Sequence, residues 1–534
     1  MRVEQVAARF RLRLLRRAVA RWPTVFEQRW TLSPPAVPAG WPTSFVSLDS
    51  LRFCDEAEAA RLLRAEFSFL GQLESVEDDW YPSAPQLWRF HLHYWDWSWH
   101  VVNNSDEVRR DDWLESTYHR WHTATSYGVG DAWSPYVVSL RLWTWCGLHA
   151  AVAGSTIQET LSDEIRRHAG YLRANIEDDV GGNHLMKNLK GLIGAGVFLQ
   201  DEGLVDWAAA RLTDQLAVQV LADGGHYERS PSYHAQVLGD LIDLQALLRA
   251  SGGTVPVELD EAIHVMRRWL GLLIGPDGDV PVFNDGYGLG ADELHRLGVA
   301  QQSSVTLTVL AESGYVVVWP RAGVQIVIDV GLPCPDDLPA HAHADCLSFE
   351  LVVGGDRVIV DTGTSEYGAT QRRQLERSTA AHNTVEIDGC DQTEVWGAFR
   401  AARRAKPRLL AVSERDGVMV VDAEHDGYRR LAGRPTHRRR FEISEHGMVV
   451  HDRARGGGFH TVISRLHVAG LVVDVRSNVV RADAGGVVIR SGSVPEVDVT
   501  GRYAREFGGN EPSTVLLQRY AGQLPMTLTW EIGW

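Results

Sequence analysis

The hydrophobic pattern of the chain changes its period near residues 300–312, and this change limits the fold more than any other feature. Before it, apolar side chains recur near positions i, i+3, i+4 and i+7, as in 55–72, 134–154 and 183–200, which predicts helices. After it, the apolar runs are short, β-branched and alternating, as in 324–330, with Gly, Asp, Asn and Ser turns between them. Many short strands with no helices between them predict a β-sandwich.

These two patterns predict an α+β multidomain protein in which a helical domain precedes an antiparallel β-sandwich. A chain of 534 residues is too long for one ordinary core, so at least two domains are expected. We predict a basic N-terminal extension over residues 1–50, a helical domain over 51–305 and a β domain over 306–534. Helical hairpins that follow one another over short connections can wrap into an incomplete toroid.

The net charge of −16 argues against nucleic acid as the main partner, because binding of polyphosphate depends on clustered Lys and Arg. Five widely spaced cysteines, an odd number, indicate reduced thiols rather than a disulfide framework. No apolar run approaches the roughly 20 residues that span a bilayer. The oligomeric state cannot be predicted from these features.

The N-terminal segment 1–22 is rich in arginine. Its arginines interrupt every apolar run, so the segment does not read as a secretory signal, and we expect a cytoplasmic location. The alternative is a periplasmic location, or export by a route that the sequence does not reveal. The segment itself predicts either a solvated basic helix or a helix that binds a membrane surface or a partner.

Tryptophan is concentrated in two segments of the helical half, 88–100 and 132–145. Trp97 and Trp133 could form the floor of a sugar-binding groove, and Arg141 could bind an anionic group. The alternative is that these tryptophans pack one helix against another.

Two polar stretches of the helical half could carry chemistry. Asn183 follows a pair of glycines and opens an apolar helix, which fits a helix N-cap, and His184 stands beside it. In 223–234, "DGGHYERSPSYH", a Pro in the first turn places Tyr233 at a helix start, where the backbone N–H groups could stabilise its phenolate and lower its pKa from about 10.

The β half contains a histidine-rich stretch that could bind a metal. His341, His343 and Asp345 alternate, so on a strand they would share one face, while Asp361 follows a strand and His382 comes later. Such a set suits a zinc site. The alternative is a hydrogen-bonded polar seam between domains.

Together these motifs resemble the heparinase II/III-like polysaccharide lyases, including related alginate lyases. The resemblance runs from about residue 80 to 470, and it rests on the order and spacing of several motifs. They are "WRFHLHYWDW", "AWSPYVVSLR", "NHLMKNLKGL", "DGGHYERSPSYH", "PVFNDG", "HAHADCLSFEL", "VDTGTSEY" and "RSTAAHNTVEIDG". The resemblance implies an incomplete α/α toroid followed by an antiparallel β-sandwich, and β-elimination on an anionic, uronic-acid-containing polysaccharide or oligosaccharide.

The resemblance also implies roles for individual residues. Asn183, with His184, matches the group that neutralises the uronate carboxylate, so that charge can develop at C5. Tyr233 matches the catalytic tyrosine, which acts as base, acid or both, and His341 matches its partner acid or base. His343, Asp361 and His382 match the ligands of one structural Zn²⁺. We interpret Glu228 and Arg229 as neighbours that orient Tyr233. Arg141, Lys187, Arg229 and Arg377 could concentrate positive charge in the cleft and bind the anionic substrate. No organic cofactor is expected.

Two other functions remain open at this point. A glycoside hydrolase needs two carboxylates that flank the bond, and Asp223, Glu228 and Asp285 are candidates. A non-catalytic glycan-binding protein would use the Trp-rich helices instead. Which uronic-acid polymer is the substrate, and whether cleavage is endo or exo, cannot be predicted from the sequence.

Overall fold

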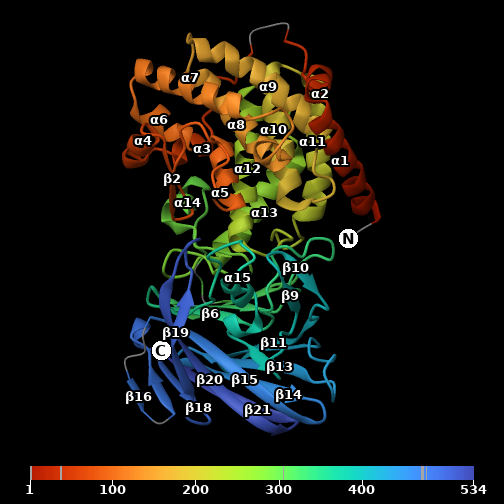
Figure 1. The fold of residues 1–534 in the computed structure, drawn as a ribbon. Helices are drawn as coiled ribbons and strands as arrows, with labels where there is room; N and C mark the ends of the chain where they lie inside the picture. The colour runs from red at the N-terminus through yellow and green to blue at the C-terminus, as the bar shows by residue number, and fades with distance from the viewer. Residues whose placement is uncertain (1–2, 36–38, 303, 305, 471–473, 477) are drawn as a thin grey trace. The chain divides into compact units, whose positions relative to one another are not determined.

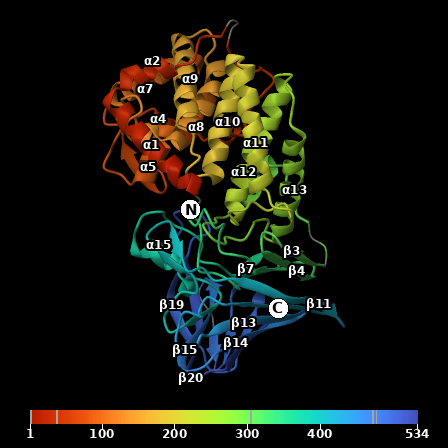
Figure 2. The same cartoon turned by 90° about the vertical axis from the view of Figure 1, so that its right-hand side faces the viewer.

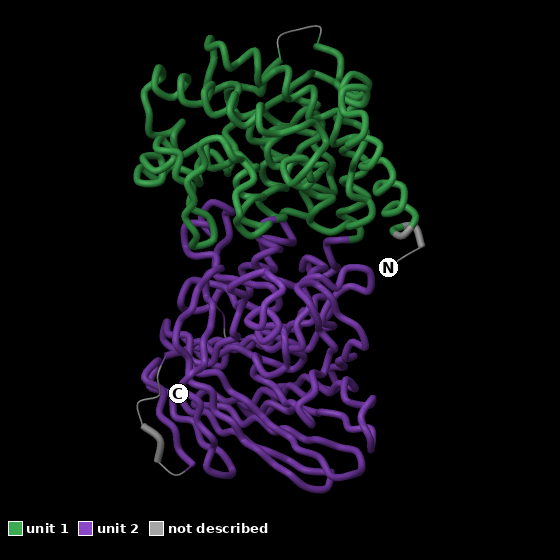
Figure 3. Tube along the Cα trace, in the orientation of Figure 1, with its two compact units in different colours: residues 1–218, 237–263 green, residues 219–236, 264–534 purple. Residues whose placement is uncertain are grey.

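The computed structural model describes residues 3–35, 39–302, 304, 306–470, 474–476 and 478–534. The chain forms two compact units (Figure 3). Unit 1 contains residues 1–218 and 237–263, and unit 2 contains residues 219–236 and 264–534. The predicted domain bounds at residues 50 and 305 stay predictions.

Unit 1 is helical, as the periodicity predicts (Figure 1). Its core is rich in aromatic side chains. The helix 135–151, for example, buries side chains on several of its faces, and tryptophans are among them. The first helices of the chain are α1 (Val3–Arg21), α2 (Pro23–Trp30), α3 (Leu48–Arg52), α4 (Glu56–Leu62), α5 (Gln86–Tyr94), α6 (Ser98–Asn104), α7 (Glu107–Ala124), α8 (Pro135–Ala151), α9 (Thr156–Ala174), α10 (Gly182–Leu199) and α11 (Glu202–Gln219).

Three more helices follow: α12 (Pro231–Ala250), α13 (Val257–Leu273) and α14 (Gly290–Arg296). Among the described residues, no helix has both the length and the apolarity that crossing a membrane requires.

One predicted helix of unit 1 is shorter than expected. The helix predicted over 55–72 ends at Leu62, and β1 (Glu66–Phe69) and β2 (Gln72–Ser75) form an antiparallel hairpin after it. Leu70 and Gly71 both adopt positive φ at the turn of this hairpin. Two consecutive residues in the left-handed conformation match the twist of a tight hairpin. The chain therefore forms a hairpin in the second part of the segment where the apolar pattern predicts a helix.

Unit 2 contains two large antiparallel sheets, which pack as layers (Figure 2). One has the order β19-β20-β15-β7-β6-β5-β4-β3, with β8 beside β15. Its strands are β3 (Thr306–Leu310), β4 (Tyr315–Arg321), β5 (Val324–Asp329), β6 (Phe349–Val353), β7 (Asp356–Ile359), β8 (Val385–Ile387), β15 (Phe459–Ala469), β19 (Glu496–Tyr503) and β20 (Glu511–Gln523).

The second sheet has the order β11-β12-β13-β14-β21-β18-β17-β16. One buried hydrophobic cluster joins both sheets, with Ile326 and Phe349 from the first and Phe441 and Trp530 from the second. The strands of the second sheet are β11 (Pro407–Arg415), β12 (Val418–His425), β13 (Thr436–Ser444), β14 (Gly447–Arg455), β16 (Asp474–Arg476), β17 (Val479–Arg481), β18 (Val488–Ser491) and β21 (Met526–Gly533).

Two small elements of unit 2 lie outside these sheets. The helix α15 (Gln371–Glu376) follows β7, and β9 (Glu394–Trp396) pairs with β10 (Arg400–Ala402) as a separate hairpin. The long segment between β5 and β6, which contains His341 and His343, has no regular secondary structure.

Candidate active site

The stretch 223–234 is a tightly held loop that leads into α12. A Cβ atom added at Gly225 would lie 2.7 Å from Ser313 Cβ and 2.8 Å from Trp269 Nε1, so only glycine fits there. Asp223 Oδ2 accepts hydrogen bonds from the Ser313 backbone N–H (2.7 Å) and hydroxyl (2.9 Å). The loop is therefore anchored against its own unit before the helix begins.

The end of this loop is fixed by its backbone. Arg229 adopts a positive φ of 60°, and its carbonyl accepts hydrogen bonds from Asn284 Nδ2 (2.9 Å) and the Tyr315 hydroxyl (2.7 Å). Helix α12 then begins at Pro231, as the sequence predicts, and Tyr233 lies in its first turn.

Tyr233 contacts two other aromatic side chains of unit 2. Its ring centroid lies 4.1 Å from that of His341, and its hydroxyl lies 2.8 Å from the hydroxyl of Tyr367. The prediction that the helix start lowers its pKa is wrong. Burial raises the pKa of the Tyr233 hydroxyl well above its ordinary value, and the neighbouring Tyr367 and the Asp285 carboxylate add to this effect. Tyr233 is therefore a neutral phenol at neutral pH.

His341 lies on an irregular loop rather than on the expected strand. Its position comes instead from Asp285, which follows Asn284 in the motif "PVFNDG". His341 Nδ1 donates to Asp285 Oδ2 at 2.9 Å, and His343 Nε2 donates to Asp285 Oδ1 at 2.8 Å, because a carboxylate can only accept. One aspartate thus orients both histidines.

Arg373 completes this arrangement. Its guanidinium donates to both oxygens of Asp285, at 2.5 and 2.7 Å, and lies 5.0 Å from the centroid of the Tyr367 ring. Burial alone would raise the pKa of the Asp285 carboxyl. The Arg373 charge and the hydrogen bonds from His341 and His343 overcome this effect and hold that pKa well below its ordinary value. Asp285 is consequently an ionised carboxylate.

The structure places the other predicted substrate-binding residues of unit 2 in supporting positions. Glu228 is buried, with Oε2 3.5 Å from His341 Nε2. Arg229 Nη1 donates to the Ser313 carbonyl at 3.2 Å. Arg377 is fully buried and donates to the carbonyls of Ala342 (2.9 Å) and Gly397 (3.1 Å), so it holds the backbone beside His341 and has no surface for a ligand.

His343, Asp361 and His382 come together as predicted and could hold a metal ion. Their ligand atoms lie within 4.8 Å of one another, and all three residues are buried. His343 uses Nε2 for Asp285, and His382 uses Nδ1 for Asp361 Oδ2 at 2.7 Å. The other nitrogens, His343 Nδ1 and His382 Nε2, are buried with no hydrogen-bond partner among the described residues, as are both oxygens of Asp345. Unsatisfied buried imidazole nitrogens are what a metal ligand set requires.

Asn183 and His184 lie in unit 1. The N-cap of α10 is Gly181, with a φ of 73°, so Asn183 is in the first turn of the helix and is not its cap. Asn183 is buried, whereas the side chain of His184 is 38% exposed. His184 Nδ1 lies 3.2 Å from Glu177 Oε1, and its ring packs 4.3 Å from that of Tyr136.

The aromatic segments of unit 1 form a core. Trp97 and Trp133 are 2% exposed, so the packing alternative describes them and the groove floor does not. Arg141 is fully buried: it donates to the carbonyls of His93 and Ala132, both at 2.7 Å, and lies over tryptophan rings. A guanidinium enclosed in this way cannot bind an exposed substrate.

Sequence reasoning missed two residues of this site and assigned a third to another function. The motif "VDTGTSEY" contains Tyr367 but indicates no role for it, no sequence motif points to Arg373, and the sequence suggests Asp285 only as a hydrolase carboxylate. Tyr367 lies six residues after Asp361, which is the one sequence signal that could have located it.

Sequence profiles of one protein family match both halves of the chain. The sequence profile "Heparinase II/III N-terminus" matches residues 93–301, and "Heparinase II/III-like, C-terminal" matches residues 304–531. The two matches together include most of the chain and both halves of the fold. The chain belongs to the heparinase II/III-like family.

Two curated relatives of this family member differ in what their names describe. FtsZ-localized protein C of Caulobacter vibrioides is 28% identical over 419 residues, which is 71% of this chain and 66% of that protein. Heparin-sulfate lyase of Bacteroides thetaiotaomicron is 23% identical over 333 residues, 53% of this chain and 45% of the lyase. The chain thus matches less than two thirds of the length of each.

Solved structures of polysaccharide lyases share the fold. The crystal structure of heparinase III superposes with a TM-score of 0.77 at 18% identity, covering 95% of this chain and 88% of that one. This confirms the predicted fold class, a helical toroid followed by an antiparallel β-sandwich.

Proposed function

We propose that the protein is a lyase that cleaves a uronic-acid-containing glycan by β-elimination. The observation that carries this proposal is the contact of Tyr233 with His341 and Tyr367, which supplies a neutral phenol beside an oriented imidazole. An elimination needs one group that accepts the C5 proton and one that donates a proton to the departing O4.

His341 is assigned as the proton acceptor. In a neutral imidazole that donates Nδ1–H to Asp285, the lone pair is at Nε2. When Nε2 takes the C5 proton, the Asp285 carboxylate, 2.9 Å from Nδ1, stabilises the charge of the resulting imidazolium. Glu228 Oε2 lies 3.5 Å from Nε2. The electron pair of the C5–H bond forms the C4=C5 double bond as the C4–O4 bond breaks.

Tyr233 is assigned as the proton donor. Its raised pKa keeps the phenol protonated until O4 departs with the electrons of the broken bond. The Tyr367 hydroxyl then donates a hydrogen bond to the Tyr233 phenolate. His341 releases its proton to solvent and Tyr233 takes one up from solvent, so that both residues return to their starting protonation states. The assignment of Asn183 and His184 as neutralisers of the uronate carboxylate rests on the family resemblance.

Two of the three carboxylates considered for a hydrolase, Asp223 and Asp285, are held by other groups of the protein. A hydrolase requires a protonated carboxyl as general acid. Asp223 is bound to Ser313, and Asp285 is bound to Arg373 with a pKa held well below its ordinary value.

The test is the ultraviolet absorbance of purified protein mixed with alginate, heparan sulfate, hyaluronan and bacterial capsular polymers. The C4=C5 bond is conjugated to the carboxylate, so elimination produces an absorbance that hydrolysis does not. We expect Tyr233→Phe to lower the rate about 100- to 10,000-fold, as loss of an acid–base group does. Tyr520→Phe, on β20, serves as the matched control and retains the rate. Equal rates in the two variants would remove Tyr233 from the reaction.

We also propose that His343, Asp361 and His382 hold about one structural Zn²⁺ per chain. Such an ion would cross-link three separate segments of unit 2. Elemental analysis of freshly purified protein should show the zinc, and His382→Ala should lose it while His446→Ala, an exposed histidine, keeps it. Metal-free wild-type protein with an unchanged thermal unfolding temperature after zinc addition would contradict the proposal.

The similarity to FtsZ-localized protein C supports a second candidate, a role at the site of cell division. We also propose that the protein is cytoplasmic. A fluorescent fusion should then follow FtsZ in dividing cells, and fractionation should recover the protein with cytoplasmic markers. Recovery from the periplasm or the medium would contradict both.

A further inference from the structure

The β9–β10 hairpin of unit 2 presents two aromatic rings to solvent. Trp396 is 45% exposed and Phe399, in the turn, is 43% exposed. Phe399 lies beside the candidate site, because its ring centroid is 5.7 Å from that of Tyr367 and the Arg373 guanidinium lies 5.8 Å from its centroid. An exposed aromatic ring that adjoins Tyr367, the hydrogen-bond partner of Tyr233, is in a position to contact substrate.

The backbone of this hairpin is held firmly. Three consecutive or near-consecutive carbonyls, those of Val395, Gly397 and Ala398, accept hydrogen bonds from side chains in and after α15. The donors are Gln374 Nε2 (2.9 Å), Arg377 Nη1 (3.1 Å) and Arg373 Nε (3.1 Å). Arg373 and Arg377 also hold Asp285 and Ala342, so the hairpin and the loop of His341 share their supports.

The fixed backbone of the hairpin indicates that the exposed rings have a function. A flexible hairpin could fold its aromatic rings inward, since burial of apolar area is favourable. A hairpin whose backbone is fixed keeps the two rings exposed to water, which is unfavourable in free energy. Because the rings are already in place, little conformational entropy is lost when a ligand stacks on them.

Cationic side chains follow the rings along the same segment. Arg400 pairs with Trp396 across the hairpin, so the two side chains share one face. Arg400 is exposed and forms no ion pair within the described part of the chain. An arginine beside an exposed tryptophan suits a sugar ring that carries a negative group.

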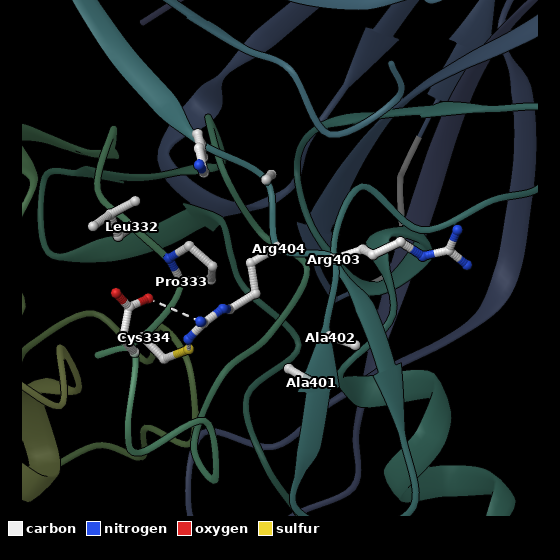
Figure 4. Close-up of a pocket in the computed structure, with 10 residues that line it drawn as sticks. Leu332, Pro333, Cys334, Ala401, Ala402, Arg403 and Arg404 are labelled. Carbon is white, nitrogen blue, oxygen red and sulfur yellow. Dashed lines mark hydrogen bonds and ion pairs between the residues drawn. The ribbon is translucent and has the colours of Figure 1, made fainter. Parts of the chain in front are cut away.

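A pocket of about 380 Å³ lies at the far end of the segment (Figure 4). Residues 401–406 form one wall and the loop 332–336 forms the other. Arg403 has a φ of 25°, and Figure 4 shows its side chain pointing away from that of Arg404. Arg403 pairs with Glu394, whereas Arg404 reaches into the pocket wall.

Arg404 lines this pocket, and groups of the protein already bind its guanidinium. It donates to the Pro335 carbonyl (2.9 Å), contacts Cys334 Sγ (3.3 Å) and pairs with Asp336 (2.8 Å), whose side chain is fully exposed to water. Lys406, which is exposed, adds a second positive charge to the lining. Arg403 and Arg404 are paired with Glu394 and Asp336. Arg400 and Lys406 form no ion pair among the described residues, so their charges could attract an anionic polymer even on a protein of net charge −16.

We propose that residues 394–406, here called the hairpin strip, bind a part of an acidic glycan that flanks the cleaved bond. Trp396 and Phe399 stack on sugar rings, and Arg400 and Lys406 pair with carboxylate or sulfate groups. This assignment rests on the proposed lyase function for its substrate class, but the binding itself does not require turnover.

The test measures binding and turnover separately. In a Tyr233→Phe background, calorimetric titration with heparan sulfate, its desulfated form and alginate gives affinities without cleavage. We expect Trp396→Ala combined with Phe399→Ala to weaken binding about 10-fold, the usual size of lost stacking. Arg400→Gln combined with Lys406→Gln should weaken it less at high salt than at low salt. Comparison of the sulfated and desulfated polymers shows which anionic group these cations bind.

Phe459→Ala is the matched control, because Phe459 is 66% exposed on β15 and lies outside the strip. In active protein, the aromatic double variant should raise KM about 10-fold with kcat within twofold of wild type. Circular dichroism and thermal unfolding confirm that the exposed truncations leave the fold intact.

The outcomes separate the two proposals. Wild type that binds glycan through the strip without forming an unsaturated product would contradict the lyase function and support the strip. Turnover with KM and affinity equal to those of Phe459→Ala would overturn the strip alone. Absence of binding to any polymer would overturn the strip, as would a double variant that changes only the self-association of the chain, which would identify a protein-docking surface.

Discussion

Unit 2 contains two clusters in which a histidine is bound to a buried aspartate that an arginine also holds. In the candidate site they are His341, Asp285 and Arg373. The second cluster, His437, Asp452 and Arg439, has the same chemistry: His437 Nε2 lies 2.8 Å from Asp452 Oδ1, and Arg439 Nη2 lies 2.8 Å from Asp452 Oδ2.

The surroundings of the two clusters differ. The side chain of His341 is 13% exposed and stacks on Tyr233, whereas His437 is fully buried on β13 and its other nitrogen contacts His425. Asp452 also accepts a hydrogen bond from Ser464 of the opposite sheet at 2.7 Å. The same three residue types therefore join two sheets in the Asp452 cluster and orient a partly exposed imidazole in the Asp285 cluster. The candidate site is distinguished by the exposure of its histidine to solvent, and not by its residue types.

The largest expected effect separates the two histidines by activity. His341→Ala should lower kcat about 100- to 10,000-fold and change the unfolding free energy little, because the ring reaches the surface. His437→Ala should do the reverse, with folded protein that retains the wild-type kcat. Rates measured per folded molecule, with denaturant unfolding of both variants, check this. A large loss of kcat in His437→Ala would show that the buried cluster contributes to catalysis.

The next effect concerns the stability of the sandwich. Asp452→Asn leaves Arg439 buried without its counter-charge, and we expect a loss of about 3–5 kcal/mol in the free energy of unfolding. Urea unfolding followed by circular dichroism measures it, with Asp416→Asn in the exposed turn after β11 as the control. A loss no larger than that of the control would mean that the cluster does not stabilise the contact of the sheets.

The smallest expected effect is the pH dependence of the difference in unfolding free energy between wild type and Asp452→Asn. Burial would raise the pKa of the Asp452 carboxyl, but the Arg439 charge and the hydrogen bonds from His437 and Arg439 overcome it and hold the pKa well below its ordinary value. A carboxyl whose pKa is depressed in the folded state contributes stability above its unfolded pKa of about 3.9 and loses it as the pH falls. The stability difference between wild type and Asp452→Asn should thus shrink by about 1.4 kcal/mol per pH unit below pH 4. A difference that stays constant between pH 6 and 3 would contradict the assigned charge state.

Local patterns of the chain determined the order of the architecture. The apolar periods predict the helices α8, α10 and α12 and the strands after residue 312, because side-chain spacing decides which faces a helix or strand can bury. Pro231 correctly marks the start of α12. The residue types of the β half indicate a His/Asp metal site, whereas the choice of His343, Asp361 and His382 came from the family resemblance. At Leu70 the apolar pattern predicts a helix, but the backbone forms the turn of a hairpin there.

Only the tertiary structure decided which polar residues share a site and which are enclosed. Arg141, Trp97 and Trp133 looked like ligands of a substrate, but their burial depends on helices far away in the sequence. Tyr367, in the segment between β7 and α15, lies within hydrogen-bond distance of Tyr233 at the start of α12, although the two are 134 residues apart in the sequence. The pKa of Tyr233 rose because burial outweighs the field of a helix start, and burial is a property of the packed fold and not of any short stretch.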